Sequence, residues 1–248
     1  MNVQLDLAKK IDAINLRFTS RVKTYLADLS SFESRSLDWL MVEHYQFSAR
    51  NTAFLATAVE TAETFDTGAV AAELRRNLAE ENGHARLYKR ALLEIGIDVG
   101  ARREFAPTSE FFGKIADLVT KDPSRMLGAM YATETAAVFE HEVFRDVSAE
   151  VFKRRAVEWE GARLKYFHDM HLSGVEQSHQ DELGVFLRNL PTGGAIAVAA
   201  ADRPTINPEH AFAGAQEAIE AMVSWWQSLL SELQVIRLSS ATLDQLRA

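Results

Sequence analysis

The sequence predicts an all-α protein, a single-domain helical bundle of about seven to eight helices that covers residues 1–248. Only 12 Gly and 5 Pro occur, and Ala, Glu, Leu, Arg and Lys dominate, a composition that favours helices over strands. Apolar side chains recur at intervals of three and four residues over most of the chain. The hydrophobic content of 47% is enough for one sizeable core, and no shift in composition divides the chain.

The first half of the chain carries four helical patterns. Gly96 follows the third pattern at the position where a glycine commonly ends a helix, and Thr108 or Ser109 can cap the fourth. The predicted helices cover about 5–29, 36–67, 69–95 and 108–119.

The second half begins with Asp122-Pro123, a capping acid followed by a proline in the first turn. The residues from Ser173 to Glu176 have the spacing of a capping box, which predicts a break or kink there. Residues 191–206 are predicted to be a connecting loop before the last helix. The predicted helices cover about 122 to at least 144, 151–171, the break at 173–176 to about 190, and 207 onward.

Charge and cysteine content restrict the function. Lys plus Arg total 27 against 35 for Asp plus Glu, and the net charge of -8 disfavours nucleic acid as a partner. The absence of cysteine excludes disulfides, thiolate metal sites and cysteine nucleophiles. There is no signal-peptide pattern and no apolar run of about 18 residues, so we expect a soluble, cytoplasmic protein with a small-molecule substrate and no membrane partner. A homodimer is left open.

Two Glu-x-x-His pairs lie on helical stripes that are otherwise apolar. Glu81 and His84 form the first pair and Glu176 and His179 the second, and residues three apart lie side by side on a helix. Because ionisable groups on core-facing stripes need partners, both pairs are candidate metal ligands.

Further candidates come from other helices. Glu134 interrupts an apolar stripe between the two pairs, and His171 lies on a core-facing stripe shortly before Glu176. Glu43 is left as a ligand, a substrate contact or a surface acid. Single glutamates from two helices and Glu-x-x-His pairs from two others are how helical bundles build di-metal carboxylate sites. Carboxylates and imidazoles without sulfur suit iron or manganese, and iron is preferred because it can activate dioxygen.

Simpler interpretations exist for several of these residues. A single Glu-x-x-His pair is common in Glu-rich helices, and His168 and His171 could form a polar cluster at a helix end. Glu80 is expected to be solvated, as is the Arg102-Arg103 pair, and Glu140 with Glu142 is expected to form an exposed acidic patch. His141 lies on the same face as Glu134 but is less well placed for a metal.

Three segments resemble a known family: residues 77–88, residues 127–134, and Tyr166-Phe167 leading into His171, Glu176 and His179. They are similar to the haem-oxygenase-like di-iron oxidases and oxygenases, relatives in fold of the type-two thiaminases and of pyrroloquinoline quinone synthase. The closing helix around Trp225-Trp226 extends the resemblance, which covers most of the chain from about Leu37 onward.

The resemblance implies a seven-helix bundle with two iron ions and dioxygen as co-substrate. The ligands it implies are Glu81, His84, a bridging Glu134, His171, Glu176 and His179. It also implies the oxidation of a small organic acid, amino acid or amine by desaturation, carbon-carbon cleavage, decarboxylation or N-oxygenation. The chain departs from the family pattern because four residues, rather than three, separate His171 from the acid, and the acid is glutamate rather than aspartate.

Three alternatives remain from the sequence. One is a ferritin-like iron-binding protein, and another is a metal-free, thiaminase-like or small-molecule-binding helical protein, although the thiaminase version lacks its cysteine nucleophile. The third is a haem protein with His44 or His84 as the axial ligand.

Overall fold

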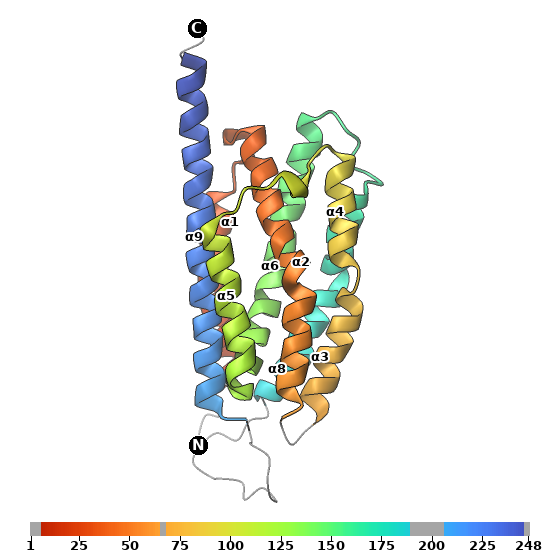
Figure 1. The fold of residues 1–248 in the computed structure, drawn as a ribbon, viewed down its shortest axis with the longest axis vertical. Helices are drawn as coiled ribbons and strands as arrows, with labels where there is room; N and C mark the ends of the chain where they lie inside the picture. The colour runs from red at the N-terminus through yellow and green to blue at the C-terminus, as the bar shows by residue number, and fades with distance from the viewer. Residues whose placement is uncertain (1–5, 65–67, 189–205, 246–248) are drawn as a thin grey trace, which may run out of the picture.

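The computed structural model describes residues 6–64, 68–188 and 206–245, and every regular element in these ranges is helical. The predicted all-α class is therefore confirmed. The helices stand side by side as a bundle (Figure 1). They are α1 (Leu7–Tyr25), α2 (Ser34–Ala62), α3 (Gly68–Glu81), α4 (His84–Glu94), α5 (Ala106–Lys121), α6 (Pro123–Arg154), α7 (Arg163–Met170), α8 (Glu176–Arg188) and α9 (Pro208–Gln245), with short 3-10 turns at Leu29–Ser31 and Val99–Ala101 and a π-turn at His171–Val175.

The long helix α6 lies at the centre of the bundle and contacts α1, α2, α5, α7, α8 and α9. Its closest neighbour is α9, because glycines let the two backbones meet. A Cβ atom at Gly128 would lie 1.8 Å from the carbonyl oxygen of Ala211, and one at Gly214 would lie 2.2 Å from that of Arg125. Apolar side chains from all nine α-helices enter one core.

Helices α3 and α4 are two segments of one interrupted helix, and so are α7 and α8. If each interrupted helix is counted once, the nine described α-helices make seven, in agreement with the predicted number. Helices α3 and α4 follow one another along one edge of the bundle (Figure 1), and α7 continues through the π-turn into α8. The prediction of one continuous helix over 69–95 is wrong. The chain leaves the helix at Gly83, whose φ of 100° suits a residue without a side chain.

The helix boundaries around residue 150 also differ from the prediction. Helix α6 continues to Arg154, past Phe144, the residue that it was expected to reach at least, because Val147 and Val151 extend its buried stripe. The predicted helix over 151–171 is wrong, since an irregular segment with positive φ at Ala156 and Gly161 precedes α7.

The predicted connecting loop at 191–206 lies almost wholly outside the described residues. None of the helices in the described part of the chain combines the length and the apolar composition needed to cross a lipid bilayer.

Candidate metal centre

Three carboxylates and three imidazoles meet inside the bundle, where α3, α4, α6 and α8 converge. Glu81, Glu134 and Glu176 are all at least nine-tenths buried, at 7%, 6% and 4% exposure. The three histidines come from α4, from the π-turn and from α8. We call this group the six-residue cluster: Glu81, His84, Glu134, His171, Glu176 and His179.

The first half of the cluster lies at the break between α3 and α4. Glu81 Oε1 lies 3.1 Å from His84 Nδ1, and His171 Nε2 lies 3.2 Å from the same nitrogen. His171 Nε2 is also 3.9 Å from Glu81 Oε1. One ligand atom from each of these three residues lies within 4.8 Å of the other two, close enough to share one ion.

The second half of the cluster is formed by Glu134, Glu176 and His179. His179 Nδ1 lies 3.6 Å from Glu134 Oε2 and 3.8 Å from Glu176 Oε2. The other oxygen of Glu176, Oε1, lies 3.7 Å from His171 Nε2 in the first half. The carboxylate of Glu176 therefore spans the two halves. The bridging role that the resemblance implies for Glu134 stays a prediction.

The π-turn explains how His171 joins the cluster despite its unusual spacing. A π-turn places residues i and i+5 together, so His171 and Glu176 face the same side although four residues separate them. Gly174, with φ of 111°, provides the backbone conformation at which the turn departs from a helix. The π-turn thus accommodates the four residues between His171 and Glu176.

The electrostatics of the cluster indicate a deficit of positive charge. No Lys or Arg of the described residues forms an ion pair with the three cluster glutamates. Burial, followed by the negative charges of Glu134 and Glu81, raises the pKa of Glu176 well above its usual value. Burial disfavours protonation of His179, but hydrogen bonds and charges from Glu134 and Glu80 outweigh it and raise its pKa to about 9.

A metal pair fits this donor set. Oε1 of Glu81 is buried and has no hydrogen-bond partner of good geometry. Burial is the main cause of a His171 pKa of about 4, so its imidazole stays neutral and keeps a lone pair. Several carboxylates that repel one another in a dry interior become favourable together when cations bind between them.

His141 and Glu80 also adjoin the cluster. From the sequence, His141 was a weaker candidate than the six cluster residues, and Glu80 was expected to be solvated. The ring of His141 stacks on His171 with centroids 3.9 Å apart, and its Nε2 lies 3.7 Å from Glu176 Oε1. The seven-residue interval from Glu134 was the signal for this placement. Glu80 is only 40% exposed, and its Oε2 accepts a hydrogen bond from His179 Nε2 at 2.7 Å.

Glu43 lies apart from the cluster. Its carboxylate is fully buried and accepts hydrogen bonds from Arg102 Nε at 2.7 Å and Nη2 at 2.8 Å, and from the Thr108 hydroxyl at 2.6 Å. Trp225 Nε1 donates to that same hydroxyl oxygen at 2.9 Å. Both oxygens of Glu43 are thus occupied by protein groups, and Arg102, which was expected to be solvated, is its counter-ion.

Glu140 corrects another expectation. It is buried rather than part of an exposed acidic patch; one carboxylate oxygen accepts a hydrogen bond from Trp226 Nε1 at 3.0 Å, and the other lies 3.8 Å from His44 Nε2. Burial raises the pKa of Glu140 to about 7. Glu142, by contrast, is half-exposed and pairs with Lys23.

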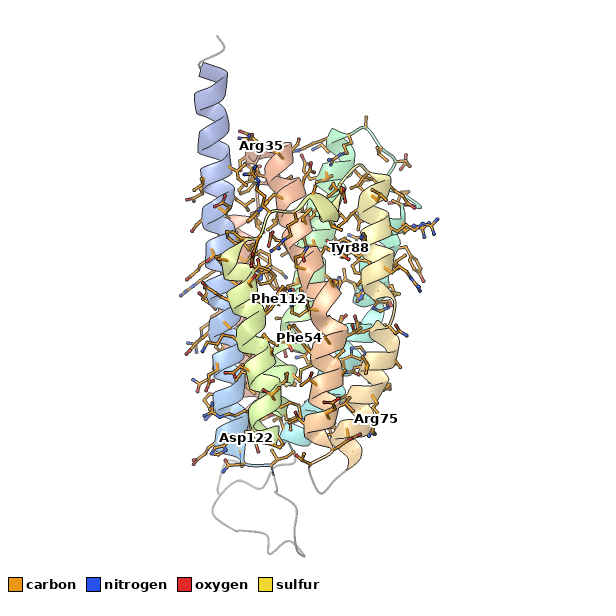
Figure 2. All side chains as sticks on the ribbon, viewed as in Figure 1. Arg35, Phe54, Arg75, Tyr88, Phe112 and Asp122 are labelled. Carbon is orange, nitrogen blue, oxygen red and sulfur yellow. The ribbon has the colours of Figure 1, made fainter. Side chains whose placement is uncertain are left out.

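A small cavity adjoins the cluster. Its volume is about 20 Å3, and its lining includes Glu81, Glu134, Glu176, His44 and Glu140. That is room for about one water molecule and far too little for a porphyrin. His44 also stacks on Phe144 at 3.6 Å and contacts the hydroxyl of Tyr88, which lies in the interior on α4 (Figure 2), so the structure argues against the haem alternative.

Comparison with known proteins gives a family without an assigned activity. A family model described as a domain of unknown function with solved structure (DUF3865) matches residues 7–232. No curated protein matches the chain.

Solved structures share the fold. A CADD-like protein of unknown function from Nostoc punctiforme aligns with a TM-score of 0.70 and 22% identity, over 92% of this chain and 94% of that one. A domain of unknown function with a heme oxygenase-like fold from Shewanella denitrificans has a TM-score of 0.63, 16% identity and coverage of 93% and 91%. A TenA homolog from Pseudomonas syringae has a TM-score of 0.62, 10% identity and coverage of 91% and 93%. The fold is therefore haem-oxygenase-like rather than that of a ferritin-like bundle.

Proposed function

The chain belongs to the DUF3865 family, and from that premise we propose that it is a non-haem di-iron enzyme that uses dioxygen to oxidise a small organic acid, amino acid or amine. The observation that carries this proposal is the meeting of three buried carboxylates with three imidazoles, without a lysine or arginine of the described residues to balance them. Cations from outside the chain would supply the missing charge.

The two halves of the cluster give each ion its own ligands. One ion would be held by Glu81, His84 and His171, the other by Glu134, Glu176 and His179. Oxygen and nitrogen donors without sulfur suit iron or manganese. Two ferrous ions bound there would supply the redox chemistry that activates dioxygen.

The chain's own residues would control access and orientation. The cavity beside the cluster has a volume of only about 20 Å3, which would limit the water that reaches the ligands. An organic substrate larger than about one water molecule requires the side chains around this cavity to move apart. Polar side chains on its wall, including Asn51 and Thr133, can then hydrogen-bond to the substrate.

The test is metal binding by two ligand variants. Glu134→Ala and His179→Ala should each abolish loading of two ferrous ions in an anaerobic titration, while far-UV circular dichroism shows nearly unchanged helicity. Exposure of the loaded wild type to oxygen should then give a transient absorption that neither variant shows.

The matched controls are a glutamate on α6 and a histidine on α9 that are about half exposed. Glu142→Ala and His210→Ala lie outside the cluster and should leave iron loading unchanged. Normal iron binding by both ligand variants would contradict the assignment of the site. Failure of the wild type to bind any iron would favour the metal-free, small-molecule-binding alternative.

A further inference from the structure

We propose that Glu80 is a positioning residue that orients His179 toward one of the two metal ions; this inference rests on the proposed function. Glu80 is not itself part of the six-residue cluster. It is adjacent in sequence to the ligand Glu81, at the end of α3, and its carboxylate reaches α8.

The geometry assigns different tasks to the two nitrogens of His179. Nε2 donates to Glu80 Oε2 at 2.7 Å, on the side away from the cluster, whereas Nδ1 faces Glu134 and Glu176. A neutral imidazole carries one proton and one lone pair. An acceptor fixed at Nε2 therefore keeps the lone pair on Nδ1, where a metal can take it.

Glu80 is held in place by a cation of its own helix. Arg76 Nη1 donates to Glu80 Oε1 at 2.9 Å, and the same guanidinium pairs with Glu73. Residues four apart lie on the same face of a helix, so α3 presents Arg76 and Glu80 together. Two consecutive residues of α3 thus serve different halves of the cluster, Glu81 as a ligand in the first and Glu80 as a support for the second.

In the first half of the cluster, the hydrogen bond that corresponds to that of Glu80 is made by a backbone group. His171 Nδ1 donates to the carbonyl oxygen of Phe167 at 2.7 Å. Because this acceptor is a backbone group, a side-chain substitution at residue 80 or 167 does not remove it. Replacement of Glu80 should therefore weaken only the ion held by Glu134, Glu176 and His179. This selectivity separates a positioning role from a general loss of stability.

The experiment compares Glu80→Ala and Glu80→Gln with wild type in an anaerobic ferrous titration that resolves two binding steps. Glu80→Ala should weaken one step about 10- to 100-fold, the usual effect of losing such a hydrogen-bonded partner, and leave the other step unchanged. Glu80→Gln should have a smaller effect because its amide oxygen still accepts the hydrogen bond. The control is Glu94→Ala, a glutamate of similar exposure, 45%, that pairs with Arg163.

A second readout follows the proton itself. In protein loaded with zinc and labelled with nitrogen-15 at histidine, Nε2–H of His179 should give a low-field resonance protected from exchange, absent in Glu80→Ala. Two unchanged binding steps together with a retained resonance in Glu80→Ala would overturn the positioning role and leave the di-iron proposal standing. A wild type that binds no metal would overturn both.

Discussion

Two buried carboxylate sites in this bundle are balanced in opposite ways. Glu43 has Arg102 and Thr108 on its two oxygens, and Thr108 is in turn held by Trp225, so its charge is matched by the protein. The six-residue cluster places three glutamates together and provides no Lys or Arg from the described residues, and Glu81 Oε1 is left without a hydrogen-bond partner.

The difference between the two sites distinguishes a structural buried charge from a candidate ligand-binding one. A carboxylate matched by an internal cation is complete once the chain has folded, and removing one partner leaves the other charge stranded. A group of unmatched carboxylates is unfavourable in the folded protein alone and becomes favourable only when cations bind. Glu43 is therefore a structural ion pair, and the cluster is the candidate functional site.

The largest expected change in unfolding free energy tests the ion pair between Glu43 and Arg102. Glu43→Ala should lower the free energy of unfolding by about 3 to 5 kcal/mol, because it strands Arg102, whose side chain is only 16% exposed. Urea denaturation of the metal-free protein measures this loss. The folded fraction of the variant should still bind two ferrous ions.

The control for this variant lies at the end of the same helix. Glu63 is 52% exposed and pairs with Arg75, so Glu63→Ala should change the free energy of unfolding by less than about 1 kcal/mol. Equal losses for the two variants, or loss of iron binding by folded Glu43→Ala, would contradict the contrast between the two sites.

Glu140 is an intermediate case that sharpens the comparison, since it has the hydrogen bond from Trp226 but no cation. Its folded pKa of about 7 lies above the usual 4.5, so the folded protein holds this proton more tightly than the unfolded chain does. The contribution to stability is present below pH 4.5 and is lost as pH rises toward 7, a change of about 3 kcal/mol.

Glu140→Gln should remove this dependence because glutamine does not ionise. The difference in unfolding free energy between variant and wild type should increase in favour of the variant by about 3 kcal/mol from pH 4.5 to 8, measured by urea denaturation without metal. His44, which faces Glu140, stays neutral over this pH range because burial lowers its pKa to about 3. A difference that is independent of pH would show that Glu140 titrates normally.

The smallest expected effect has the opposite sign to that of Glu43→Ala. Glu176→Gln should raise the free energy of unfolding of the metal-free protein by about 1 kcal/mol at pH 8. Burial and the charges of Glu134 and Glu81 raise the pKa of Glu176, so the folded protein bears a cost for holding this carboxyl either charged or protonated, and glutamine avoids that cost. The same variant should lose iron binding, as followed in the anaerobic titration. Destabilisation of the metal-free protein by Glu176→Gln would mean that the cluster is balanced without metal.

The sequence by itself determined the fold class and the candidate residues. Low glycine and proline content and helical periodicity predicted the all-α bundle, and the periodicity also placed Glu81, Glu134 and Glu176 on core-facing stripes. Periodicity records which side of a helix is buried, and that is a local property of the chain. Periodicity did not predict the helix geometry at Gly83 and in the π-turn, where the backbone leaves the α-helix. A few residues change the backbone geometry there without changing the apolar pattern.

Only the tertiary structure decided which buried charge meets which partner. Arg102 and Glu43 are 59 positions apart, and His179 and Glu80 are 99 apart, so no local pattern connects them. In the sequence, Arg102, in the segment before α5, and Glu80, near the end of α3, both look like ordinary surface residues. Their roles follow from the packing of separate helices, because a charge in a dry interior is stabilised by whichever opposite charge or hydrogen-bond donor the fold brings within about 3 Å.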